Sequence, residues 1–101
     1  MKSISTSELA ALGADATIID VREADEFASA RVAGAINLPL SELAGRLADI
    51  PQGGTFYVMC LSGGRSARAT AFLIENGFAA VNVLGGINQW HQDGFPVMQA
   101  A

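Results

Sequence analysis

One stretch of the chain decides both its fold and its chemistry: Tyr57-Val58-Met59-Cys60-Leu61-Ser62-Gly63-Gly64-Arg65-Ser66. It contains the only cysteine of the 101 residues, placed directly after a β-rich apolar run, 55–59. Two glycines follow, and a helix-like segment begins at Ser66. A turn from strand to helix directs backbone N–H groups and the positive end of the helix dipole at whatever lies in the loop.

A cysteine in such a turn is expected to ionise more readily than usual. The loop N–H groups and the neighbouring Arg65 stabilise the thiolate over the thiol. A free cysteine is more often a buried structural residue, but the run Gly63-Gly64-Arg65 immediately after it favours a reactive one. We therefore predict that Cys60 is a nucleophile in an anion-binding loop.

Composition and charge narrow the class of protein. Half of the residues are apolar, which is enough for a core without metal or disulfide support. A single cysteine forms no internal disulfide, which fits a reducing compartment. The net charge of −4 argues against nonspecific nucleic-acid binding, which requires a basic face. Both bases of the second half, Arg65 and Arg68, follow Cys60 closely, which suits a small anionic substrate.

Location and partners are predicted from what the chain lacks. No apolar run approaches the roughly 20 residues that a membrane-spanning helix needs. The start, Met1-Lys2-Ser3-Ile4-Ser5, has no apolar segment typical of a signal peptide. We predict a cytoplasmic protein with no membrane or nucleic-acid partner, no metal ion and no cofactor.

Strands and helices are expected to alternate along the whole chain. Strands are predicted to end at Ile4 and to span 17–21, 35–38, 55–59 and 80–84. A first helix is predicted from the capping box of Ser5 and Glu8 to Leu12, and a second over 23–30. A third is predicted from an N-cap at Ser41 through Leu43, Leu47 and Ile50. The last two are predicted over 66–76 and from Gly85-Gly86 to Trp90. This alternation predicts one α/β domain over residues 1–101 with a mainly parallel sheet. Ligands of such sheets bind beyond the carboxyl ends of the strands, where Cys60 falls.

Some side chains are assigned to packing rather than to chemistry. Phe27 is expected to anchor its helix in the core, and Trp90 is expected to be buried. The pair Asp20 and Arg22 is expected to fix turns and helix ends by hydrogen bonding. The apolar positions of the 66–76 helix are Ala67, Ala71, Phe72 and Ile74.

Four segments of the chain, in order, resemble those of a known family. They are Ile19-Asp20-Val21-Arg22 with Glu26-Phe27, then Val32-Ala33-Gly34-Ala35-Ile36-Asn37-Leu38-Pro39, then Cys60 to Ser66 as Cys-x-x-Gly-x-Arg-Ser, and finally Leu84-Gly85-Gly86-Ile87 with Trp90 and Gly94-Phe95-Pro96-Val97. The chain thus resembles the rhodanese (sulfurtransferase) family over nearly its whole length. One departure is Ala30-Arg31-Val32, where the family usually reads Gly-His-Ile. This change is expected to affect the rim of the site or the packing of the preceding helix.

The resemblance implies a fold and a reaction. The fold is rhodanese-like α/β, with a central, mainly parallel five-stranded sheet flanked by helices on both faces. The enzyme is thiosulfate sulfurtransferase-like: the Cys60 thiolate takes a sulfur from a small anionic donor such as thiosulfate, and a thiol, cyanide or protein acceptor removes it from the Cys60 persulfide. Arg65 holds the loop, contacts the donor, or does both. The implied substrate-binding residues are Leu61, Ser62, Gly63, Gly64, Arg65 and Ser66.

Three other functions compete with sulfur transfer by turnover. A cysteine phosphatase also uses a Cys…Arg loop, but with one residue more than the four that separate Cys60 from Arg65 here, and no aspartate is evidently placed as its acid. A sulfur carrier or a catalytically silent regulatory module is a second alternative, although silent modules usually lack the cysteine. A Cys–His protease is a third, and the sole histidine, His91, is expected to lie at the surface or in packing contacts.

Overall fold

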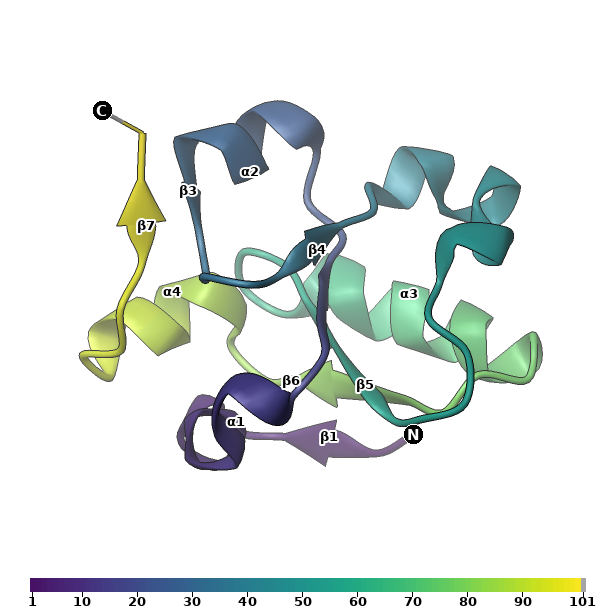
Figure 1. Ribbon diagram of the computed structural model, residues 1–101, viewed down its shortest axis with the longest axis horizontal. Coiled ribbons are helices and arrows are strands. Elements are labelled where there is room, and N and C mark those ends of the chain that lie inside the picture. The colour runs from purple at the N-terminus through teal and green to yellow at the C-terminus, as the bar shows by residue number, and fades with distance from the viewer. Residues whose placement is uncertain (101) are drawn as a thin grey trace.

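Five parallel strands form the centre of the structure, side by side in the order β1-β6-β5-β2-β4 (Figure 1). The computed structural model describes residues 1–100. The strands of this sheet are β1 Ser3–Ile4, β2 Ile18–Asp20, β4 Ile36–Asn37, β5 Phe56–Met59 and β6 Ala80–Val83. Each neighbouring pair is parallel, which confirms the predicted sheet. A separate antiparallel pair joins β3, Ala30–Arg31, to β7, Met98–Gln99.

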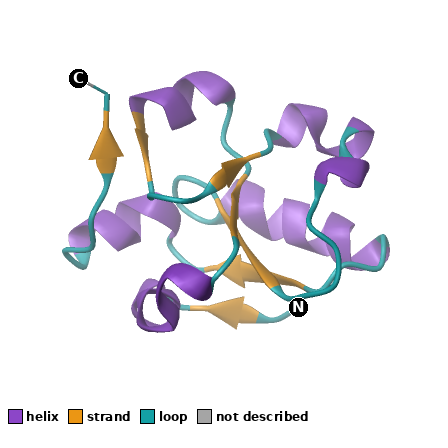
Figure 2. Ribbon diagram, in the orientation of Figure 1, coloured by secondary structure: helices purple, strands orange, loops and turns teal. Residues whose placement is uncertain are grey.

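Helices cover both faces of the sheet (Figure 2). They are α1 Thr6–Leu12, α2 Ala24–Ser29, α3 Gly64–Glu75 and α4 Gly86–Gln92, with 3₁₀ helices at Gly13–Asp15, Leu40–Gly45 and Leu47–Asp49. Side chains alternate between the faces along each strand. Ile19 and Val58 therefore belong to a core cluster shared with α3, and Ile18 and Met59 to a second cluster shared with α1 and α4. Among residues 1–100, no helix is both long and apolar enough to cross a membrane.

The first helix forms as its sequence predicts. The Ser5 side chain accepts from the Glu8 N–H, and the Glu8 carboxylate accepts from the Ser5 N–H, both at 3.0 Å. Gly13 ends the helix. Two orphan amides are satisfied by this reciprocal pair, so a helix of only seven residues is stable at its start.

The segment after Pro39 differs from its prediction. It forms two short 3₁₀ helices instead of one α-helix, because Gly45 interrupts it and neither part is long enough to propagate an α-helix. Ser41 is not an N-cap; its hydroxyl donates to Glu23 Oε1 at 2.7 Å. Leu43 and Ile50 are nevertheless buried, so the apolar spacing correctly predicted which side faces the core.

The prediction that Phe27 anchors α2 in the core is also wrong. Phe27 is only half-buried, and no residue of α2 is fully buried. The guanidinium of Arg31 lies 5.4 Å from the centre of the Phe27 ring. Arg31, where the chain departs from the family pattern, thus packs against the preceding helix through a cation–π contact.

The buried face of α3 is more polar than its apolar residues suggested. Ala71 and Ile74 are exposed, and the buried positions are Ser66, Ala69, Thr70 and Leu73. Thr70 is tolerated inside because its hydroxyl donates to the Ser66 carbonyl at 2.7 Å. Relative to the predicted orientation, α3 is therefore rotated about its axis so that Ser66 faces the carboxyl end of β5.

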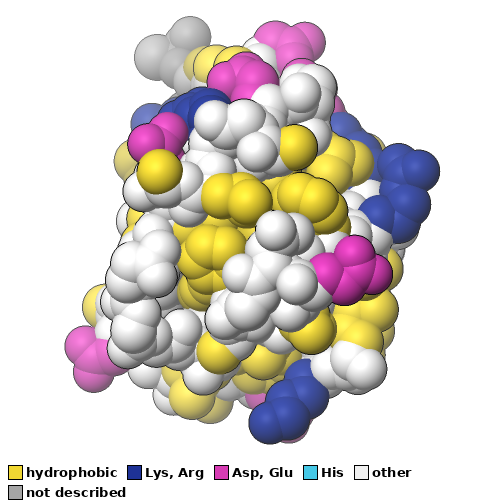
Figure 3. All heavy atoms as spheres, turned by 90° about the vertical axis from the view of Figure 1, so that its right-hand side faces the viewer, with side chains coloured by type: hydrophobic (Ala, Val, Ile, Leu, Met, Phe, Trp, Pro, Cys, Tyr) yellow, Lys and Arg dark blue, Asp and Glu magenta, His cyan; other side chains and the backbone are white. Residues whose placement is uncertain are grey.

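The amino ends and the carboxyl ends of the strands carry different surface features. Figure 3 shows hydrophobic side chains gathered on one face of the molecule. A hollow of about 310 Å³ lies at the amino ends of the strands, with Met1, Ile74 and Phe78 in its lining. The loop that contains Cys60 follows β5 at the opposite, carboxyl end of the sheet.

Gly86 places α4 against that loop. Gly86 has φ +58°, and a Cβ on it would lie 2.4 Å from the Cys60 carbonyl oxygen. This contact lets the Ile87 N–H donate to the Cys60 carbonyl at 2.9 Å and the Asn88 N–H donate to the Leu61 carbonyl at 3.0 Å. The carbonyls at the start of the loop are thus held on the α4 side.

Replacing Gly86 by alanine should therefore destabilise the protein. The new methyl group meets backbone atoms that cannot move aside, at a backbone angle that disfavours alanine, so we expect a loss of about 2–4 kcal/mol in the free energy of unfolding. Urea denaturation measures this loss. Gly64→Ala is the matched control: nothing lies within 4 Å of its would-be Cβ, and an alanine in the first turn of a helix should be neutral or stabilising by about 0.5 kcal/mol. Equal losses in the two variants would contradict this account of Gly86.

Candidate active site

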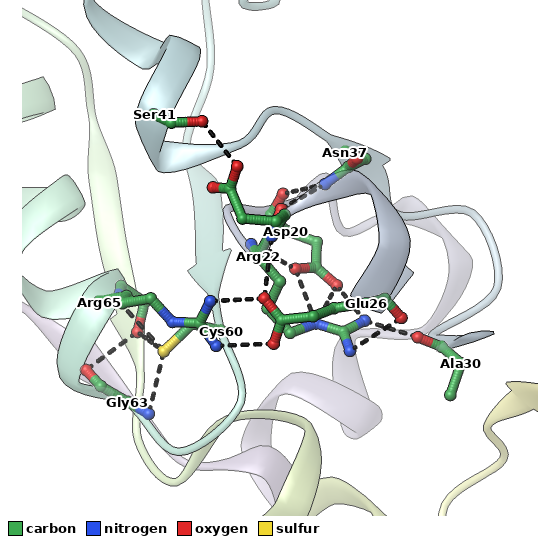
Figure 4. Close-up of polar contacts among 11 residues, drawn as sticks. Asp20, Arg22, Glu26, Ala30, Asn37, Ser41, Cys60, Gly63 and Arg65 are labelled. Atoms are coloured by element: carbon green, nitrogen blue, oxygen red, sulfur yellow. Dashed lines mark hydrogen bonds and ion pairs between the residues drawn. The ribbon is translucent and has the colours of Figure 1, made fainter. Parts of the chain in front are cut away.

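The Cys60 sulfur lies inside the loop that connects β5 to α3 (Figure 4). Its Sγ accepts hydrogen bonds from the Gly63 N–H at 3.1 Å and from the Ser66 N–H at 3.3 Å. Cys60 is only 1% exposed, whereas Leu61 and Ser62 of the same loop are exposed. Backbone N–H donors therefore hold the sulfur in a buried position inside the loop, and the neighbouring residues Leu61 and Ser62 face the solvent.

Ser66 brings a side-chain hydroxyl to the same sulfur. Its Oγ lies 3.4 Å from Cys60 Sγ. The same oxygen is 3.1 Å from the Gly63 carbonyl and 2.7 Å from Asn82 Oδ1. Two oxygen acceptors thus compete for the single hydroxyl proton of Ser66, while the Cys60 thiol donates to its oxygen.

The environment lowers the pKa of the Cys60 thiol below its usual 9.0, in the direction that the sequence predicts. Burial is the largest influence and raises the pKa. The Ser66 hydroxyl and the N–H groups of Ser66, Gly63 and Ser62 together outweigh it, because each stabilises the thiolate. The contacts that favour the anion come from the loop itself.

Gly63 is the glycine that the loop geometry requires. Its φ is +110°, a conformation that other residues avoid. A Cβ at this position would also lie 3.3 Å from the Gly85 nitrogen. Gly63 therefore turns the chain so that its own N–H faces the sulfur, whereas Gly64 has no comparable constraint.

Arg65 is bound to α2. Its Nη1 and Nη2 donate to the two carboxylate oxygens of Glu26 at 2.6 and 2.9 Å. The hydrogen bond from Arg65 lowers the pKa of Glu26 to about 2, against the opposing effect of burial and with help from the Glu23 N–H. Of the two roles considered for Arg65, holding the loop is the one that this geometry supports directly.

Asp20 and Arg22 fix the helix that carries Glu26. They form a buried ion pair, with Arg22 Nη2 2.8 Å from Asp20 Oδ2. The same guanidinium donates to the carbonyls of Ala30 at 2.6 Å and Glu26 at 3.4 Å, near the end of α2. Their expected role in holding turns and helix ends is confirmed, and through α2 it extends to the position of the Arg65 partner.

Sequence reasoning missed two residues of this network. Glu26 stands in the sequence only as part of a segment that resembles the family, and Asn82 belongs to no motif of the sequence. Asn82 carries a signal in retrospect: it is an amide within the strand Ala80–Val83, whose other residues are apolar. A polar residue within a buried strand requires a partner, and here the partner is Ser66.

The hollows of the surface do not compete with this site. One of about 440 Å³ lies between α1, α4 and residues 32–34 and has no ionisable side chain in its lining. A smaller one of about 170 Å³ borders the loop at Leu61 and is also lined by Arg22 and His91. His91 is exposed and makes no hydrogen bond with the Cys60 sulfur, so the structure holds no Cys–His pair in the part of the chain that it describes.

Comparisons with known proteins agree with this fold and loop. The family model of the rhodanese-like domain matches residues 5–93. A sulfurtransferase of Allochromatium vinosum is 33% identical over 97 residues, which cover 95% of this chain and 91% of the relative. A putative sulfur carrier protein of Bacillus subtilis is 35% identical over 74 residues, which cover 72% of this chain and 40% of that longer protein.

A solved structure gives the same answer. The crystal structure of a rhodanese-related protein from Thermoplasma volcanium matches with a TM-score of 0.92 and 36% sequence identity, over 97% of this chain and 98% of that one. Sheet order, the Cys60 loop and the family match all point the same way. The chain belongs to the rhodanese-like domain family.

Proposed function

We propose that this protein transfers sulfur through a persulfide on Cys60, from a donor such as thiosulfate to a thiol, cyanide or protein acceptor. The observation that carries the proposal is the set of polar groups around Sγ: two N–H groups that donate to it at 3.1 and 3.3 Å, and the Ser66 hydroxyl oxygen at 3.4 Å, which accepts from the thiol. The two N–H groups stabilise Sγ as a thiolate, which is the form that attacks a sulfur donor.

The reaction has two halves. The Cys60 thiolate attacks the outer sulfur of thiosulfate, a new S–S bond forms, and sulfite leaves with the electron pair of the bond that breaks. An acceptor nucleophile then attacks the outer sulfur of the persulfide, and the Cys60 thiolate returns. Because Cys60 is the only cysteine, no second thiol of the chain can resolve the persulfide, and the acceptor must come from outside.

The size and surroundings of the loop favour sulfur over phosphate. Four residues separate Cys60 from Arg65, and the sulfur is almost wholly enclosed. Asp20 pairs with Met59, next to Cys60, but its carboxylate is buried and bound by Arg22. It is therefore not free to protonate a leaving group, which a phosphatase would require.

A sulfur carrier with low turnover is the second candidate, supported by the similarity to a putative sulfur carrier protein. Carrier and enzyme share the persulfide and differ in its release. A carrier loads one sulfur per Cys60 and releases it slowly to small thiols, whereas an enzyme turns over. A silent regulatory module is disfavoured by the intact donors around Cys60.

The central test is the mass of the protein after incubation with thiosulfate. We expect Cys60 to gain the mass of one sulfur atom, sulfite to be released, and added thiol to reverse the change. Cys60→Ser should gain nothing and release no sulfite. The absence of any adduct on the folded wild-type protein, or aryl phosphate hydrolysis that Cys60→Ser abolishes, would overturn the proposal.

The role proposed for Arg65 predicts how stability depends on pH. The folded-state pKa of Glu26 is about 2 against an ordinary 4.5, so its ion pair stabilises the fold fully above about pH 4.5 and is lost as the pH falls toward 2. Both side chains are 31% exposed. After allowance for solvent screening, Glu26→Gln should lower the free energy of unfolding at pH 7 by about 1 kcal/mol.

Chemical denaturation between pH 2 and 7 measures the effect, and the gap between Glu26→Gln and wild type should close at the acid end. Glu42→Gln is the matched control, because Glu42 pairs with Arg46 at 3.0 Å in a more exposed setting. It should change stability by no more than about 0.5 kcal/mol. A gap for Glu26→Gln that is constant with pH would contradict the assignment of this ion pair.

A further inference from the structure

Asn82 is a buried amide in an apolar part of the sheet. It is 5% exposed and lies in β6 between Ser3 of β1 and Val58 of β5. Burying an amide costs free energy unless hydrogen bonds replace its contacts with water. Its side chain is directed toward α3, where Ser66 Oγ lies 2.7 Å away. Ser66 alone therefore links the Asn82 side chain to the sulfur of Cys60.

The hydroxyl proton of Ser66 cannot be donated to all of the neighbouring acceptors at once. Its hydroxyl has one proton, and the Gly63 carbonyl, Asn82 and Cys60 Sγ compete for it. With a protonated thiol, the S–H donates to Ser66 Oγ, and Ser66 donates to Asn82 Oδ1. A thiolate has no proton to donate, so the Ser66 hydroxyl must turn toward the sulfur to stabilise it.

A side-chain amide can adapt when the Ser66 hydroxyl turns toward the sulfur, whereas most other side chains cannot. Asparagine has an acceptor oxygen and a donor NH₂ that exchange places when the group makes a half-turn. With the NH₂ toward Ser66, the amide donates to Ser66 Oγ and leaves the hydroxyl proton directed at the sulfur. A carboxylate could only accept, and an aliphatic side chain could do neither.

We propose that Asn82 is a positioning residue for Cys60: its side-chain amide turns between two orientations and so directs the Ser66 hydroxyl proton to the sulfur whenever the sulfur is anionic. The amide acts through Ser66 and touches neither donor nor acceptor. For the thiolate this proposal stands on the geometry alone. For the persulfide it rests on the proposed sulfur transfer.

The test is a double-mutant cycle read by the ionisation of Cys60. Wild type, Asn82→Leu, Ser66→Ala and the double variant are titrated by the ultraviolet absorbance of the thiolate, with Cys60→Ser subtracted. We expect Asn82→Leu to raise the pKa of Cys60 when Ser66 is present and to leave it unchanged when Ser66 is alanine. Asn82→Ala is interpreted in the same way if the leucine variant does not fold.

Alkylation by iodoacetamide gives a second readout at a fixed pH below the titration midpoint. Losing one hydrogen bond to a charged group lowers the thiolate fraction about tenfold, and the higher nucleophilicity of the remaining thiolate offsets about half of this on a logarithmic scale. We therefore expect Asn82→Leu to react about threefold more slowly.

Thr70→Val is the matched control. Thr70 is a buried hydroxyl one turn further along α3, and it donates to the Ser66 carbonyl rather than to the hydroxyl. It should lower stability without moving the Cys60 titration. The proposal is overturned if Asn82→Leu leaves the titration unchanged, or if its effect is the same with and without Ser66. No sulfur donor is used, so failure to form a persulfide would count against sulfur transfer and not against this role of Asn82.

Discussion

The structure depends on the hydrogen bonds that two backbone N–H groups, of Gly63 and Ser66, donate to a buried sulfur. Removing a thiol from water disfavours its ionised form, so burial alone would make Cys60 unreactive. The loop reverses this outcome because its donors are fixed by the backbone and lose little entropy when the charge forms. A lowered thiol pKa and burial are therefore compatible here, and the glycine conformation at position 63 is what makes them so.

The rest of the fold holds this loop from two sides. On one side, the close approach of Gly86 lets α4 bind the carbonyls of Cys60 and Leu61. On the other, Arg22 fixes the end of α2, and the Glu26 carboxylate of α2 binds the Arg65 guanidinium. These contacts join segments far apart in the sequence. They explain why family resemblance is spread over four separate segments around a single cysteine.

Local patterns predicted most of the fold and the centre of the site. β-Branched runs, the capping box at Ser5 and the glycines after Cys60 each act over a few residues, so the sequence displays them directly. One error was local, and the others arose where distant contacts decide. Gly45 and short segment length made 3₁₀ helices of a predicted α-helix, and Ser66, fixed by its contact with the sulfur, turned polar positions of α3 inward. Asn82 was missed because its partner lies 16 residues away on another element.

The most direct measurement of the central claim is the pKa of the Cys60 thiol in the folded protein, compared with that of the same chain unfolded in urea. Cys60 is the only cysteine, so thiolate absorbance reports on it without ambiguity once the Cys60→Ser background is subtracted. If the loop donors outweigh burial, the folded pKa lies below the unfolded one. A folded pKa equal to or above the unfolded value would show that burial prevails and would contradict the account.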